Sequence, residues 1–218
     1  MKLRTTFAFI ALAASASAAL INGSFETPAG LPLELVDSTN DEGAFGWTVV
    51  SGSVETVANN LNGSDLVAED GVRYLDLDGF SGGHISQSMA TVIGQTYLLT
   101  FVYSNNPFPG STIPAGADVQ LSDAQGVIGV NAIFHDTAAI AGGADWTPYS
   151  QMFVAREAST SVDFISFGGG ASLGGILLDA VSLDVSPIVI PEPSTFGLVM
   201  AAVGLVMIGR KSGVRRKL

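Results

Sequence analysis

Asp179 is the clearest candidate for a functional residue, because its carboxylate lies in an apolar stretch of sequence. It lies in an apolar run from Leu177 to Val185 and shares the two-residue alternation of the apolar side chains there. In a regular strand its carboxylate would face the core, where an ionised carboxylate is costly unless it is hydrogen-bonded, paired or bound to a cation. Because basic residues are scarce, two compensations stay open: hydrogen bonds from backbone amides, or a calcium ion with oxygen ligands.

Aromatic residues form the second set of candidates, because a flat ring face can cover the apolar side of a sugar ring. Trp47 and Trp146 are the strongest of these, and Tyr74 competes for the same role. Packing in the core is the alternative for each tryptophan. We therefore predict Trp47, Tyr74 and Trp146 as carbohydrate-binding candidates and leave core packing open.

A G-x-S-x-G pattern at Gly79 to Gly83 matches the nucleophile elbow of serine hydrolases. That motif needs a strand, a sharp turn and then a helix, whereas the residues that follow, His84 to Met89, alternate like a strand. The histidines His84 and His135 are far apart and have no carboxylate-rich spacing around them. The pattern indicates a glycine-rich hairpin connection, and we predict no enzyme activity.

The charge balance of the chain restricts its partners. Of its 9 Lys and Arg residues only Arg73 and Arg156 lie between residues 19 and 190, against all but one of its 20 Asp and Glu residues. Such a surface repels phosphate backbones and excludes nucleic acid as a partner, but it is compatible with divalent cations and neutral sugars. Cysteine is absent, so the fold must depend on its core, with or without a bound metal.

The elements that must position these residues are predicted to be strands. No long helix-period stretch occurs between residues 20 and 187, and short alternating runs bounded by Gly, Asn, Asp and Pro recur. The clearest alternation, over residues 97–103, predicts a core-facing row of side chains. Strands are expected at 45–50, 53–57, 73–77, 84–90, 96–104, 117–122, 127–134, 147–155, 160–167 and 175–185. The pattern predicts an all-β domain over residues 19–188, built as a two-sheet sandwich of jelly-roll type.

The first residues have the composition of a secretory signal peptide. Lys2 and Arg4 precede an apolar run from Phe7 to Ala14, and Ala16-Ser17-Ala18 supplies the small residues of a cleavage site. The apolar run is shorter than the ~20 residues of a bilayer span, which makes an anchor helix the weaker alternative. We therefore predict a signal peptide at residues 1–18 and an exported protein.

Residues 189–218 resemble the PEP-CTERM sorting signal of Gram-negative bacteria. Pro191-Glu192-Pro193 is followed by a short apolar run at 196–208 and by a basic end. The run is marginal for spanning a bilayer, and the basic cluster would hold its end on the cytoplasmic side. The resemblance implies a transient transmembrane helix at the inner membrane, cleavage at or near Pro191, Glu192 and Pro193 by an exosortase-type membrane protease, and delivery to the cell surface or extracellular matrix. An ordinary C-terminal membrane anchor is the alternative.

The body of the chain carries a series of short motifs. They are, in order, Asn22-Gly23-Ser24-Phe25-Glu26, Gly46-Trp47, Gly52-Ser53-Val54-Glu55, Tyr74-Leu75-Asp76-Leu77, Ile85-Ser86-Gln87, Gly94-Gln95-Thr96-Tyr97, Phe153-Val154-Ala155 and Leu178-Asp179-Ala180-Val181. The series is similar to that of choice-of-anchor C proteins and of related plant cell-wall domains of unknown function, which look like carbohydrate-binding modules with a galactose-binding-like jelly roll. In such modules a structural calcium often joins the first and last strands, which implies calcium as a cofactor held by Glu26 and Asp179.

These features predict an exported, non-catalytic β-sandwich that binds polysaccharide at the cell surface or in the matrix. The alternative is a purely structural protein of an exopolysaccharide or biofilm matrix, without specific sugar binding. A binding module should carry exposed aromatic rings beside Asp, Asn or Gln on one concave sheet face. A matrix protein should bury Trp47 and Trp146 and lack such a platform.

Overall fold

The computed structural model describes residues 20–40, 43–106, 115–136, 143–168 and 175–186. The chain divides into two units, Met1–Ser186 and Pro187–Leu218, and the described residues all lie in the first. The predicted signal peptide and the sorting motif Pro191, Glu192 and Pro193 lie outside the described residues and stay predictions. Among the residues described, no helical segment has the length and apolarity needed to cross a membrane.

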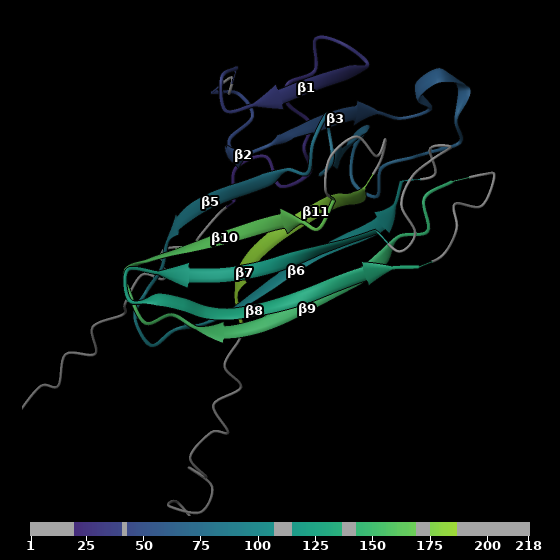
Figure 1. Cartoon of the computed structure of the whole chain (residues 1–218). Coiled ribbons are helices and arrows are strands. Elements are labelled where there is room, and N and C mark those ends of the chain that lie inside the picture. The colour runs from purple at the N-terminus through teal and green to yellow at the C-terminus, as the bar shows by residue number, and fades with distance from the viewer. Residues whose placement is uncertain (1–19, 41–42, 107–114, 137–142, 169–174, 187–218) are drawn as a thin grey trace, which may run out of the picture. The chain divides into compact units, whose positions relative to one another are not determined.

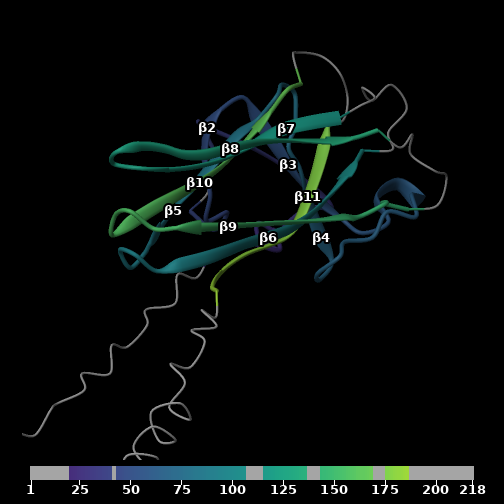
Figure 2. The ribbon, with the colours of Figure 1, turned by 90° about the horizontal axis from the view of Figure 1, so that it is seen from below.

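Eleven strands and one short 3₁₀ helix, η1 (Leu61–Gly63), make up the described residues. One sheet has six strands in the order β1 (Leu33–Asp37), β3 (Ser53–Ala58), β4 (Arg73–Asp76), β11 (Ile176–Val185), β6 (Thr96–Asn105) and β9 (Thr147–Val154). The other has five, in the order β2 (Thr48–Ser51), β5 (His84–Ala90), β10 (Ser159–Ser166), β7 (Ala115–Asp123) and β8 (Gly126–His135). All of these pairings are antiparallel. The predicted all-β, two-sheet jelly-roll sandwich is confirmed, and its two layers can be followed in Figures 1 and 2.

One strand, β1, has no counterpart among the strands predicted from the sequence. It pairs only with β3 and lies at the edge of the six-stranded sheet. Of its five residues only Val36 is buried, so the strand carries no alternating pattern. Edge strands of this kind lack the one-sided burial on which the prediction of strands depends.

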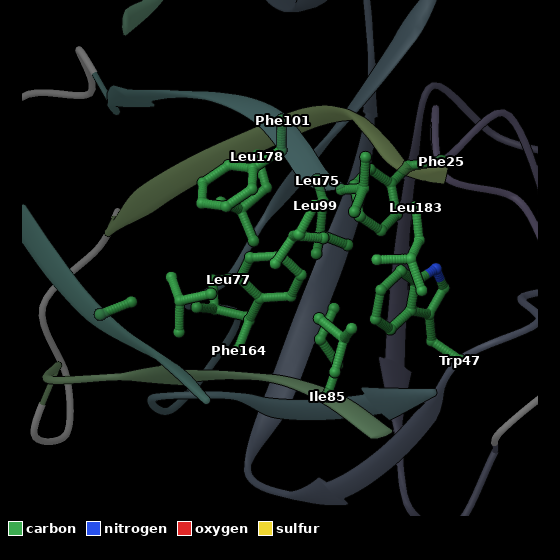
Figure 3. Packing of buried hydrophobic residues seen from close by; sticks show 14 of the residues in the cluster. Phe25, Trp47, Leu75, Leu77, Ile85, Leu99, Phe101, Phe164, Leu178 and Leu183 are labelled. Carbon is green, nitrogen blue, oxygen red and sulfur yellow. The ribbon is translucent and has the colours of Figure 1, made fainter. Parts of the chain in front are cut away.

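The core lies between the two sheets. In β6, Tyr97, Leu99 and Phe101 are almost completely buried, which confirms the core-facing row predicted there. Phe101 meets Phe164 of the opposite sheet edge-on, with ring centroids 5.0 Å apart. Figure 3 shows this contact among the packed aliphatic side chains. Because the chain has no cysteine, apolar burial must hold the sheets together.

A β-bulge in β11 changes the direction of Asp179. The register with β6 shifts between Asp179 and Ser182, and Ala180 has a positive φ of 52°. The extra residue reverses the alternation, so Val181 lies in the core, whereas Asp179 is opposite Val102 on the other face. The prediction that Asp179 faces the core alongside Val181 is therefore wrong, because β11 is not a regular strand.

Candidate functional site

The G-x-S-x-G segment lies in the connection between β4 and β5. Ser53 Oγ accepts hydrogen bonds from the backbone N–H groups of Phe80 and Ser81 at 2.8 and 3.3 Å. The chain then enters β5 directly, so no helix follows, as predicted. The connection turns back on itself through an antiparallel bridge between Asp78 and Gly82, although β4 and β5 belong to different sheets.

Trp47 is a core residue. Only 1% of its surface is exposed, and the rings of Phe25 and Phe164 both lie 5.8 Å from it, centroid to centroid. Its indole Nε1 donates a hydrogen bond to the carbonyl oxygen of Asn22 at 3.3 Å. The prediction of Trp47 as a sugar-stacking platform is wrong for this structure, because its ring faces are covered by other side chains.

Tyr74 and Trp146 lie together in a second, smaller apolar cluster. Tyr74 is 2% exposed and packs against the edge of Trp146, with ring centroids 6.2 Å apart. The cluster also contains Leu66 and Leu177. Trp146 is partly exposed, and its Nε1 donates a hydrogen bond to the carbonyl oxygen of Val67 at 2.9 Å. Of the two, only Trp146 keeps ring surface that a ligand could reach, and Tyr74 offers no face for stacking.

Asp179 is completely buried, but beneath the segment before β4 rather than in the core. Its Oδ2 accepts hydrogen bonds from the backbone N–H groups of Glu69 and Asp70 at 2.7 and 2.9 Å, and its Oδ1 accepts one from Ala180 at 2.7 Å. These bonds lower the pKa of Asp179, but burial has the larger effect and raises it to about 7. The carboxylate therefore holds the segment 69–70 against β11.

Glu26 holds the next residues of the same segment. Its Oε1 accepts hydrogen bonds from the backbone N–H groups of Val72 and Arg73 at 2.8 and 2.9 Å. The carboxylate also lies close to Gly71, where an added Cβ would be 2.3 Å from Oε1. The two residues predicted as calcium ligands thus bind one segment, 69–73, through backbone amides.

Glu26 and Asp179 are the carboxylates predicted to hold calcium. Calcium takes six to eight oxygen ligands, with several carboxylates among them in high-affinity sites. In the part of the chain that the structure describes, no three His, Cys, Asp or Glu side chains gather in a way that could hold a metal ion. Amide hydrogens already point at the carboxylates. The residues present do not form a calcium donor set, and calcium binding stays a prediction from the resemblance.

A second buried carboxylate lies at the other end of β4. Asp76 is 2% exposed. Its Oδ1 accepts a hydrogen bond from the backbone N–H of Asp78 at 2.9 Å, and its Oδ2 accepts one from Asn106 Nδ2 at 2.6 Å. Burial raises the pKa of Asp76 to about 7, and the neighbouring carboxylates of Asp78 and Glu55 add to the effect. Asp76 therefore carries a proton in the folded protein at a pH where an ordinary aspartate would not.

Two exposed aromatic rings meet on the five-stranded sheet, whereas a third, Phe80, lies in the connection between β4 and β5 and is 75% exposed. Phe134, the penultimate residue of β8, is 55% exposed, and Phe167, just after β10, is 47% exposed. Their ring centroids are 5.4 Å apart. Between them in the sheet lies Gly116 of β7, where an added Cβ would be 2.8 Å from Phe134 Cδ1 and 2.8 Å from Phe167 Cδ2. The two rings meet above this glycine, and we call Phe134 and Phe167 the ring pair.

Polar side chains follow the ring pair on the same outer face of the sheet. Asp118 lies two residues beyond Gly116 on β7, and Gln120 two residues further, and both are partly exposed. On the neighbouring strands, His84 Nε2 lies 2.9 Å from Asp163 Oδ1. A surface with two exposed rings beside carboxylate and amide groups can stack on sugar rings and bond to their hydroxyls.

No Lys or Arg among the described residues faces the ring pair. Arg73 is buried and donates to the carbonyl oxygens of Leu31 and Thr56 at 2.9 and 2.8 Å. Arg156 pairs with Asp123 at 2.9 Å, at the far end of β7 from Gly116. The outer face of the five-stranded sheet is therefore acidic to neutral, which favours a ligand without negative charge.

Sequence reasoning missed Phe134 and Phe167 because strand pairing, not sequence proximity, brings them together. Each belongs to an apolar run whose alternation does not mark it as exposed. A glycine within a strand often marks a place where another group approaches the backbone closely, but the predicted strand begins at residue 117 and leaves Gly116 out, whereas β7 begins at Ala115.

The chain belongs to the family described as "Protein of unknown function (DUF642)", whose pattern matches residues 18–184. No curated protein matches the sequence.

Solved structures similar to this chain include several carbohydrate-binding modules. One is TmCBM61 in complex with beta-1,4-galactotriose, at 16% identity and a TM-score of 0.49, over 78% of this chain and 100% of that one. A family 35 carbohydrate-binding module from Clostridium thermocellum is 12% identical with a TM-score of 0.42, over 72% of this chain and 100% of that one. An arabinose-bound α-L-arabinofuranosidase is 16% identical with a TM-score of 0.48, over 77% of this chain and 26% of that enzyme.

Replacing Asp179 with Ala should lower the free energy of unfolding by on the order of 2 kcal/mol, because the part-buried amides of Glu69 and Asp70 lose their acceptor. Urea unfolding measures this loss, and we expect the same loss in calcium and in chelator. The opposite result would be that a chelator lowers the melting temperature of the wild type but not that of Asp179→Ala. That result would show that a calcium ion binds at Asp179.

Replacing Asp76 with Asn should flatten the dependence of stability on pH. The folded-state pKa of Asp76 is raised from 3.8 to about 7, so the folded protein binds this proton more tightly than the unfolded chain does. The free energy of unfolding of the wild type should therefore fall as pH rises from about 4 to about 7. Urea unfolding at a series of pH values should show a smaller fall for Asp76→Asn. The exposed Asp184→Asn is the control, and equal slopes for all three proteins would refute the prediction.

Proposed function

We propose that this protein is a non-catalytic module that binds a neutral polysaccharide on the outer face of its five-stranded sheet. The observation that carries the proposal is the ring pair, two exposed phenylalanines that meet above Gly116. Exposed apolar rings cost free energy in water, and grouped exposed apolar side chains commonly mark a binding surface. Stacking on the apolar face of a sugar ring is a use that suits both their flatness and their position.

The surroundings of the ring pair support a saccharide rather than a protein or lipid partner. Asp118 and Gln120 supply hydrogen-bond acceptors and donors within the next two rows of the sheet. Sugar hydroxyls can use both, whereas a purely apolar partner would leave Asp118 without compensation. The absence of Lys and Arg from this face, within the described residues, favours a neutral sugar over an acidic one.

The second candidate is a purely structural matrix protein without specific sugar binding. The burial of Trp47 favours it, because this reading expects the tryptophans in the core. It gives no role to the ring pair, however. Binding to defined polysaccharides decides between the two candidates.

The route of the protein is also part of the proposal. We propose export by the signal peptide at 1–18, transient insertion of residues 196–208 in the inner membrane, and cleavage at Pro191, Glu192 and Pro193 by an exosortase-type protease. The cell surface or extracellular matrix is then the final location. This part rests on the sequence resemblance, and the acidic body is compatible with it.

Affinity electrophoresis of the full chain in gels containing neutral polysaccharides tests the proposed function. We expect retardation by at least one of a β-glucan, a galactan, a mannan and a xylan, and none by an acidic polymer such as polygalacturonate. Phe134→Ala should bind at least tenfold more weakly, a loss of about 1.4 kcal/mol. Met152→Ala, a large exposed side chain on the other sheet, is the matched control and should bind like the wild type. If no polysaccharide retards the wild-type protein, the structural matrix role becomes the better explanation.

A further inference from the structure

The outer face of the five-stranded sheet continues beyond the ring pair as a set of small hydroxyl side chains. Ser88, Ser161 and Ser122 stand in register across β5, β10 and β7, and we call them the serine row. Ser88 Oγ lies 2.9 Å from Ser161 Oγ and 3.2 Å from Ser159 Oγ. These hydroxyls are accessible and bond to one another, so they can exchange their partners for ligand hydroxyls at little cost.

The ring pair and the serine row lie at opposite ends of one path along β10. Six residues separate Phe167 from Ser161, a distance of roughly 20 Å at about 3.3 Å per residue. Two outward residues of β10 lie between them. Ile165 is partly buried, and Asp163 is only 7% exposed. No strongly exposed side chain of β10 therefore interrupts the path.

Asp163 in the middle of this path already has a hydrogen-bonding partner. Its Oδ1 lies 2.9 Å from His84 Nε2, and the two residues come from adjacent strands of the same sheet. Beside it, Ser86 is paired with Asp163 and Gln120 lies on its other flank. The middle of the path thus offers the hydroxyl of Ser86 and the amide of Gln120 beside the paired Asp163.

We propose that the site takes an internal stretch of an unbranched neutral polysaccharide, which lies along β10 from the ring pair to the serine row. This inference rests on the proposed function and adds to it the form of the ligand. A path of roughly 20 Å along a strand accommodates an extended oligosaccharide rather than a single sugar ring. The rings at one end stack on Phe134 and Phe167, and those at the other end bond to the hydroxyls of Ser161 and Ser88. A chain end is not required, because the path has no side chain that closes it among the described residues of β10.

Titration calorimetry of the full chain with β-1,4-linked gluco-, galacto-, manno- and xylo-oligosaccharides of one to six units tests the inference. In the series that binds, the affinity should rise at least tenfold from the monosaccharide to the tetrasaccharide and change less than twofold from there to the hexasaccharide. A monosaccharide that binds as tightly as the tetrasaccharide would overturn the inference but leave the proposed function in place. Failure of every series, together with unretarded migration in the affinity gels, would contradict the proposed function itself.

Variants in the serine row test whether the ligand reaches that end of the path. The double variant Ser88→Ala and Ser161→Ala should bind the tetrasaccharide at least fivefold more weakly, with unchanged binding of the disaccharide, because only the longer ligand reaches the serine row. Ser182→Ala is the control, since Ser182 Oγ makes a similar bond, 2.8 Å to Thr100 Oγ1, on the other sheet. Wild-type affinity of the double variant for the tetrasaccharide would overturn the proposed path.

Discussion

Backbone amides, rather than Lys or Arg, are the partners of the two carboxylates that anchor residues 69–73. The body of this protein holds almost all of the acidic residues of the chain but only two Lys or Arg residues, Arg73 and Arg156. Asp179 and Glu26 therefore take hydrogen bonds from the backbone of residues 69–73. These bonds hold that segment on the outer face of the six-stranded sheet, next to the small cluster of Tyr74 and Trp146. One sheet is thus partly covered by its own chain, whereas on the outer face of the other, within the described residues, Ser88 and the ring pair are exposed.

The same shortage of Lys and Arg is the basis for the neutral ligand that we propose. Arg73 is used inside the fold, where carbonyl oxygens accept its guanidinium hydrogens, and Arg156 is paired with Asp123. An acidic polymer would meet carboxylates without any compensating charge. A neutral polysaccharide needs only ring faces and hydrogen-bonding groups, which the ring pair, Asp118 and the serine row supply.

The sequence predicts the class of fold well and the binding surface poorly. Alternation of apolar residues is a direct consequence of burial on one face, so it located most strands and the buried row of β6. The bulge at Ala180 could not be foreseen, because one extra residue leaves no mark in composition but reverses the direction of Asp179. The burial of Trp47 depends on tertiary packing against Phe25 and Phe164, which no local sequence pattern encodes.

Nuclear magnetic resonance of the isotope-labelled protein with the tetrasaccharide that binds tests the central claim most directly, because it maps contacts residue by residue. The account predicts that the amide signals with the largest shifts belong to Gly116, Phe134, Phe167 and Ser161. Shifts that cluster instead around Trp146 and the segment 61–70 would place the ligand on the six-stranded sheet and contradict the account.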